Sequence, residues 1–168
     1  QNMVGEENRG WYVTLMTMNF ERSGVGGVAE AKRTVSELVQ FAKETKWDDK
    51  TLWDNPFVRH RLAQLAIEIE VGRALSYRVA WLQEKGEMAA AEASAAKVYG
   101  SELGQRLAYT GCTIMGLYGQ VKRGSKWAPL MGRFESAYQL SLGMNIAAGS
   151  SEIMRNIIAW RGLELPRA

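Results

Sequence analysis

The sequence is poor in cysteine and histidine. The first shortage excludes an internal disulfide, and the second argues against a metal site. A single cysteine, Cys112, excludes a disulfide within the chain. That fits a reducing compartment, and we expect a cytoplasmic protein with Cys112 in its core. The one histidine, His60, stands between two arginines, with no cysteine or carboxylate near it at ligand spacing. The sequence therefore predicts no metal site and places His60 on the surface.

Long apolar runs and blocks of one charge are also missing. No apolar run approaches the roughly 20 residues that cross a bilayer, so we expect no membrane partner. The 21 lysines and arginines alternate with 18 acidic residues and leave a formal charge of +3. Without a basic run, the chain lacks the usual charge pattern of a nucleic-acid-binding protein, and no nucleic-acid partner is expected.

Proline is scarce as well, at positions 56, 129 and 166 only, and the apolar spacing between these prolines is helical. It predicts helices over residues 10–44, 56–85, 88–117, 130–146 and 150–163. Long helices joined by short connections favour an all-α fold, an antiparallel four-helix bundle with a short extra C-terminal helix. The 168 residues fit one domain.

The first predicted helix carries one carboxylate on an otherwise largely apolar face. The face consists of Thr14, Met18, Glu21, Val25 and Val28, at helical spacings of three and four. A carboxylate there is costly unless it is paired or functional. Two interpretations stay open: Glu21 pairs with a basic residue across the bundle, or Glu21 has a chemical role. Three glycines at 24, 26 and 27 either kink this helix or let a ligand approach.

The C-terminal segment "GSSEIMRNIIAWRGLELPR" (149–167) resembles the C-terminal signature of the acyl-CoA dehydrogenase family, where a Gly-(Thr/Ser)-Ser-Glu-Ile-x-Arg run opens the last helix. "VGEENRGW" (4–11) is similar to the exit from that family's middle β-domain, and "ASAAKVYGSELGQRLA" (93–108) to the third helix of its C-terminal bundle. The resemblance implies that residues 1–9 are the tail of a linker from a missing middle β-domain. Residues 10–168 then form the C-terminal helical domain.

That resemblance implies an FAD-dependent oxidoreductase of acyl-CoA thioesters. In the family, a carboxylate removes a proton from Cα while hydride leaves Cβ for the flavin, and the product is the trans-2-enoyl-CoA. Hydrogen bonds to the thioester oxygen acidify the Cα proton. The implied partners are the acyl-CoA substrate, an electron-transfer flavoprotein as electron acceptor, and further subunits in a homo- or hetero-oligomeric dimer or tetramer.

In most of the family the base immediately precedes the glycine of the C-terminal motif, and there this chain has Ala148. The isovaleryl and long-chain branches instead carry the base on the first helix, followed by an arginine. "MNFERSG" (18–24) supplies that pair, so the resemblance implies Glu21 as the base and Arg22 as an organiser beside it. The residues expected at the substrate are Met18, Ala148, through its backbone N–H, and Gly149.

Three positions match cofactor contacts of relatives: Thr113, Ser150 and Glu152. As a pattern, Ser150 and Glu152 also suit a helix cap and an acidic first turn. Many relatives hold FAD across a subunit interface with Arg-x-x-Phe-Gly and a later glutamine, but here the region reads "KWDDKTLWDNPF" (46–57), and Thr113 replaces a second glutamine. These departures suit a subunit of a mixed assembly whose flavin contacts are split between unlike subunits. Together with Ala148 they also leave open an alternative, a non-catalytic helical oligomerisation module. An offshoot that oxidises a nitroalkane or similar substrate is a third alternative.

Overall fold

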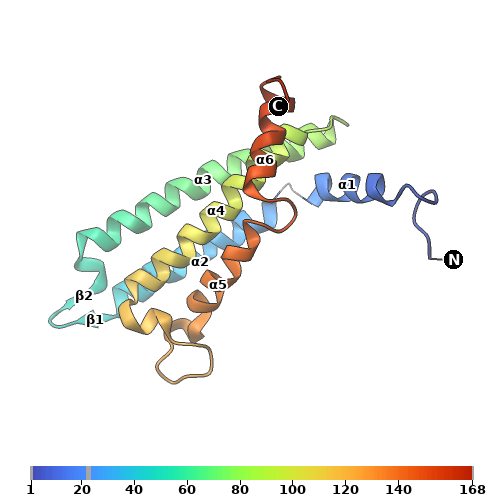
Figure 1. Cartoon of the computed structure of the whole chain (residues 1–168). Coiled ribbons are helices and arrows are strands. Elements are labelled where there is room, and N and C mark those ends of the chain that lie inside the picture. Colours follow the sequence, from blue (N-terminus) through green and yellow to red (C-terminus); the bar gives the residue numbers. More distant parts are fainter. Residues whose placement is uncertain (1, 22–23, 168) are drawn as a thin grey trace.

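The computed structural model describes residues 2–21 and 24–167, with only the backbone of residues 19 and 20. Four helices form an antiparallel bundle (Figure 1): α2 (Val25–Glu44), α3 (Pro56–Glu84), α4 (Ala90–Ile114) and α5 (Arg133–Met144). A short helix, α6 (Ser151–Ile157), packs against α4 and continues as the π-helical turn η4 (Ile158–Gly162). The predicted four-helix bundle with an extra C-terminal helix is confirmed.

The bounds of α3 follow from signals at its two ends. The Asn55 side chain caps the helix by accepting a hydrogen bond from the backbone N–H of Phe57 at 2.9 Å, and Pro56 occupies the first helical position. At the other end, Gly86 has a φ of 76°, which a helix cannot continue. The helix predicted over residues 56–85 is therefore confirmed, to within one residue at its C-terminal end.

The prediction of one helix over residues 10–44 is wrong. Helix α1 (Gly10–Glu21) ends before Gly24, whose φ of 69° is left-handed, and α2 begins at Val25. A left-handed residue breaks the hydrogen-bond ladder, and glycine adopts it without strain. α1 extends away from the bundle (Figure 1), so the predicted apolar face does not continue across the break. Along it, Thr14, Glu21 and Val25 are exposed, whereas Met18 and Val28 are half-buried.

The connector between α2 and α3 forms a small hairpin that the sequence pattern did not reveal. Strand β1 (Lys46–Trp47) pairs antiparallel with β2 (Lys50–Thr51), and a 3₁₀ turn, η1 (Leu52–Asp54), leads into α3. The Asp54 carboxylate accepts hydrogen bonds from the backbone N–H and the hydroxyl of Thr51, both at 2.8 Å. These hydrogen bonds lower the pKa of Asp54 below its ordinary value.

The core lies between α2, α3, α4 and α5. Its most buried side chains include Leu38, Leu62, Leu65, Ile69, Leu103 and Phe134. Phe134 lies against Gly111 so closely that a Cβ at residue 111 would come within 2.1 Å of a ring carbon. Arg133 joins α5 to α2 through an ion pair with Glu37 and a 2.7 Å hydrogen bond to the Thr34 hydroxyl.

Because neighbouring helices run antiparallel, the bundle has two distinct ends (Figure 1). The hairpin end holds β1, β2, the C-terminus of α4, the 3₁₀ turns η2 (Gly116–Gln120) and η3 (Pro129–Gly132), and the start of α5. The α6 end holds the start of α2, the connection from α3 to α4, the C-terminus of α5 and α6. The two ends carry different candidate sites.

Candidate functional site

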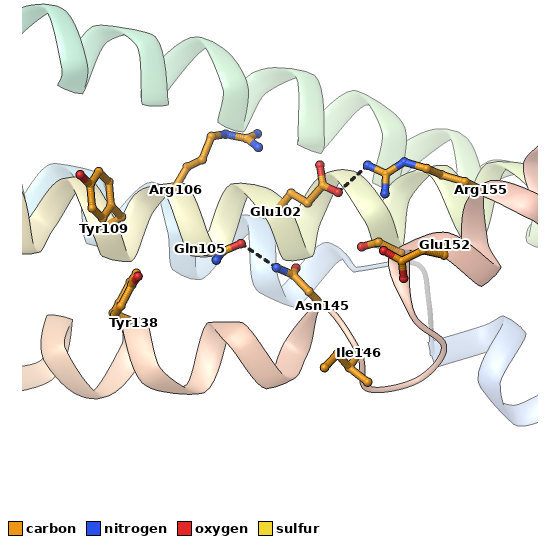
Figure 2. A pocket seen from close by; sticks show the side chains of 10 residues that line it. Glu102, Gln105, Arg106, Tyr109, Tyr138, Asn145, Ile146, Glu152 and Arg155 are labelled. Atoms are coloured by element: carbon orange, nitrogen blue, oxygen red, sulfur yellow. Dashed lines mark hydrogen bonds and ion pairs between the residues drawn. The ribbon is translucent and has the colours of Figure 1, made fainter.

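A groove between α4, α5 and α6, here called the α6 groove, reaches the α6 end of the bundle (Figure 2). Its volume is about 510 Å³. Most of its walls are polar, with two tyrosines at the far side from α6. The lining residues are Glu102, Gln105, Arg106, Tyr109, Tyr138, Asn145, Ile146, Ser151, Glu152 and Arg155.

The turn from α5 to α6 is held in place by the α4 helix. The backbone carbonyl of Asn145 accepts hydrogen bonds from the backbone N–H of Ser151 at 3.0 Å and from Lys97 Nζ at 3.3 Å. The Asn145 side-chain amide donates to Gln105 Oε1 at 2.6 Å (Figure 2). Ser150 caps the N-terminus of α6, since its hydroxyl accepts a hydrogen bond from the backbone N–H of Ile153.

Two buried oxygens beside this turn lack a hydrogen-bond donor in the part of the chain that the structure describes. Ser151 Oγ and Asn145 Oδ1 have no hydrogen-bond partner among the residues that the structure describes, and both residues line the α6 groove. Ser151 is only 6% exposed. Buried oxygens normally find a donor, so these two suit a ligand that brings N–H or O–H groups to the groove.

The charges around the groove are largely compensated. Arg155 Nη2 lies 2.6 Å from Glu102 Oε1 (Figure 2), which ties α6 to α4. The pKa of Glu152 is below its ordinary value, because its own backbone N–H and the Ser150 hydroxyl hydrogen-bond to the carboxylate, with Arg155 and Lys97 adding favourable charge. The mouth of the groove therefore carries an ionised carboxylate at neutral pH.

Most of the predicted site residues lie toward the α6 end. Glu21 ends α1 and is exposed, and α2 begins four residues later in the sequence, at Val25, at that end. Ala148 and Gly149 form the turn before α6 and both have a positive φ, 55° and 101°. Met18 is half-buried on α1, one turn before Glu21. Arg22 lies outside the described residues.

Thr113 is separated from the others, because it lies at the hairpin end of α4. It is about 24 Å along the helix from Lys97, the residue that contacts the α5–α6 turn. There it lines a second cavity of about 610 Å³, the hairpin groove. Neighbouring lining residues in that groove include Trp47, Asp48, Asp49, Lys50, Asp54 and Phe57. Of the three residues predicted to contact a cofactor, Thr113 therefore lies at the hairpin end of this domain, whereas Ser150 and Glu152 lie at the α6 end.

The prediction from sequence did not include Gln105, Tyr109, Tyr138 or Asn145. Tyr109 and Tyr138 face each other across α4 and α5, with ring centroids 6.2 Å apart. A signal was present in the spacing, because Gln105 and Tyr109 are four residues apart on α4, and Tyr138 of α5 lies seven residues before Asn145, the residue that follows α5. Helical spacing alone, however, does not tell which exposed polar face meets another helix.

The fold and the groove together define an antiparallel helical-bundle domain with a polar groove beside its last helix, α6. No group of histidine, cysteine or carboxylate side chains suited to a metal ion occurs among the described residues. In the same part of the chain, no helix is both long and apolar enough to cross a membrane.

Comparison with known proteins assigns this domain to a family. Residues 8–163 match the family model "Acyl-CoA dehydrogenase, C-terminal domain", and the chain belongs to the acyl-CoA dehydrogenase family through this domain. Acyl-CoA dehydrogenase FadE26 of Mycobacterium tuberculosis is 32% identical over 99% of this chain and 43% of its own length. The caffeyl-CoA reductase-Etf complex subunit CarC of Acetobacterium woodii is 27% identical over 95% of this chain and 40% of its own length.

A solved structure shows the same fold. A chain of the ChsE4-ChsE5 complex from Mycobacterium tuberculosis superposes with a TM-score of 0.85 at 31% identity, over 98% of this chain and 43% of that one. The chain thus spans less than half the length of the relatives that it matches.

Proposed function

We propose that this chain is the C-terminal domain of an FAD-dependent acyl-CoA dehydrogenase, with Glu21 as the base that removes the Cα proton of an acyl-CoA thioester. Membership of the family supports the reaction class. The observation that supports Glu21 as the base is a contrast between residues 148 and 21, both at the α6 end. The turn before Gly149 has no carboxylate, because residue 148 is alanine, whereas Glu21 supplies one where α1 ends.

The described contacts leave the Glu21 carboxylate available for proton abstraction once the pocket is complete. Its carboxylate is exposed and makes no hydrogen bond or ion pair with another residue in the described part of the chain. The alternative pairing with a basic residue across the bundle therefore receives no support from the described contacts. Met18, one helical turn earlier, is positioned to contact the acyl chain beside the same carboxylate. Positioned general bases contribute rate factors of about 10² to 10⁴.

We further propose that the α5–α6 turn holds the thioester. A backbone N–H at Ala148 or Gly149 that donates to the thioester oxygen stabilises the enolate charge as the Cα proton leaves. Such a donor needs no side chain, so an alanine at residue 148 is compatible with this role. The trans-2-enoyl-CoA is the expected product.

The α6 groove fits the ring and sugar-alcohol part of FAD. Ser151 Oγ and Asn145 Oδ1, which have no donor among the described residues, can accept hydrogen bonds, and the Glu152 carboxylate is a further acceptor. Residues Ser150, Ser151 and Glu152 are thus proposed to hold the flavin end. The chemistry that FAD supplies when bound is uptake of the hydride from Cβ. A flavoprotein complex partner is proposed as the electron acceptor, because CarC is by name a subunit of an Etf complex.

The hairpin groove does not fit a diphosphate. It is lined by the carboxylates of Asp48, Asp49 and Asp54, and Lys50 is the one basic residue among its described lining residues. Like charges at this spacing disfavour an anionic ligand. We therefore propose a mixed assembly in which an unlike subunit supplies the contacts that Thr113 and the hairpin do not, as the ChsE4-ChsE5 relative is itself a complex of two named chains.

We also propose that residues 1–9 are the tail of a linker from a middle β-domain, since the relatives are more than twice as long as this chain. In that case α1 is covered by the rest of the protein. Its exposed side chains Trp11, Tyr12 and Met16 agree with that placement.

The test of the base is anaerobic mixing of the full-length flavoprotein with an acyl-CoA, following the loss of flavin absorbance. Glu21→Gln is expected to slow the reduction at least about 100-fold. Glu30→Gln, a second exposed carboxylate on α2, is the matched control and keeps the parent rate. Reduction of Glu21→Gln at the parent rate would show that another group is the base.

A rival function is a non-catalytic oligomerisation module, and the acidic hairpin groove favours it. The yellow colour of bound flavin distinguishes the oligomerisation module from the dehydrogenase. If the full-length protein stays colourless with FAD, both alone and with its partner subunit, the module is correct and the dehydrogenase proposal fails.

A further inference from the structure

The turn that joins α5 to α6 is closed by backbone hydrogen bonds at both of its ends. At the α5 end, the N–H groups of Ile146 and Ala147 both donate to the carbonyl of Gly143, at 3.0 and 2.9 Å. At the α6 end, the N–H of Ser151 donates to the carbonyl of Asn145 at 3.0 Å. A turn that is closed in this way keeps its internal shape, so its orientation depends on what holds Asn145.

Two side chains of α4 hold Asn145, one by its amide and one by its backbone. Gln105 Oε1 accepts a hydrogen bond from Asn145 Nδ2 at 2.6 Å (Figure 2). Lys97 Nζ donates to the Asn145 carbonyl oxygen at 3.3 Å. Lys97 and Gln105 are eight residues apart and so lie on the same side of α4. The α4 helix thus sets the direction in which the turn faces.

The amide of Asn145 is held at a cost. While Nδ2 donates to Gln105, Oδ1 is buried and has no donor among the described residues. A buried oxygen without a donor disfavours folding. The start of α6 is already secured by the Ser150 cap, so the contact between Gln105 and Asn145 is best explained by a role in the groove that both residues line.

We propose that Gln105 is a positioning residue for removal of the Cα proton. By holding the Asn145 amide, it directs the backbone of the α5–α6 turn at the thioester oxygen. This inference rests on the proposed function, in which an N–H of that turn stabilises the enolate. Gln105 touches no reacting atom and acts through Asn145. Donors that stabilise a developing charge act only when they are well aimed, and a misplacement of about 1 Å costs roughly 100-fold in rate.

The other contacts between α4 and this region are weaker candidates for that role. Glu102 pairs with Arg155, which lies on α6 itself rather than in the turn. Both of these side chains are partly exposed, so water and salt weaken their attraction. The Lys97 contact is longer than the one from Gln105, and a lysine side chain is flexible. The contact between Gln105 and Asn145 is short, partly buried and uncharged.

The test uses the full-length flavoprotein and a 3-thia acyl-CoA, which can lose its Cα proton but has no Cβ hydride to transfer. The bound thioester and its enolate absorb at different wavelengths, so their ratio is measured at saturation. Gln105→Met keeps the side-chain length but removes the acceptor, and the ratio of enolate to thioester is expected to fall at least about 10-fold. Gln64→Met is the matched control and keeps the parent ratio, because the Gln64 amide hydrogen-bonds Glu68 within α3. Loss of folded protein lowers the amount bound but not this ratio.

A second variant tests whether Gln105 acts through Asn145. Asn145→Ala is expected to lower the ratio by a similar factor, and Gln105→Met/Asn145→Ala by no more than either change alone, because both remove the same contact. A parent ratio in Gln105→Met, or a double variant that falls by the product of the two single effects, would overturn the positioning role. A parent protein that forms no enolate would refute the proposed function, and this inference with it.

Discussion

Replacing Gly111 by alanine tests how tightly α4 and α5 are packed beneath the two tyrosines of the α6 groove. In an ordinary helix interior, glycine to alanine stabilises by about 1 kcal/mol. At Gly111 the new Cβ would lie 2.1 Å from Phe134 Cδ1 and 2.5 Å from Cε1, and Phe134 is 2% exposed. The ring cannot leave without opening the core, and overpacking of this kind costs about 1 to 3 kcal/mol.

We therefore expect Gly111→Ala to lower the free energy of unfolding by about 1 kcal/mol net, despite the better helix former. The matched control is Gly104→Ala on the same helix, where a Cβ meets nothing within 4 Å. That variant should gain about 0.5 to 1 kcal/mol. Urea unfolding of the purified protein measures both, and adding Phe134→Leu to Gly111→Ala should restore part of the loss. Equal stabilisation by the two alanines would refute the close contact.

Three further predictions concern the N-terminal cap of α6, the turn before α3 and the turn before α6. Ser150→Ala removes the cap on the Ile153 N–H and should cost about 1 kcal/mol in thermal or urea unfolding, while Ser150→Asp keeps the stability. Because the pKa of Asp54 is lowered in the folded state, its stabilisation is present above the ordinary aspartate pKa and is lost as the pH falls through the folded value. The gap in unfolding free energy between the parent and Asp54→Asn should therefore shrink below roughly pH 4, and a constant gap contradicts the Thr51 hydrogen bonds. Ala148→Gly should leave the stability equal or up to about 1 kcal/mol higher, because residue 148 is left-handed, and a clear loss argues against that conformation.

The fold was largely predictable because its helices carry strong local signals. Asn55 and Pro56 start α3 and Gly86 ends it, and the apolar spacing between them is helical. The break at Gly24 was not predictable, since glycine inside a helical pattern is compatible with a helix, a kink or a stop. The hairpin at 46–51 escaped prediction because strands of two residues are too short to show alternation.

The candidate site was predictable only in part. The motif at 149–155 correctly indicated the start of a helix capped by Ser150. The α6 groove needed the structure, because Tyr109 and Tyr138 come together only once α4 and α5 pack. The separation of Thr113 from Ser150 was not predictable either. The distance between residues of different helices follows from the sequence only when the topology of the bundle is known.

The measurement that tests Glu21 most directly separates proton removal from hydride transfer. A 3-thia acyl-CoA has sulfur at the β position and so has no Cβ hydrogen to give up, but its Cα protons can still exchange with D₂O in the active site. Mass spectrometry of the recovered thioester should show rapid exchange with the parent full-length protein and with Glu30→Gln. With Glu21→Gln the exchange should be at least about 100-fold slower. Exchange by Glu21→Gln at the parent rate would contradict the assignment of Glu21 as the base.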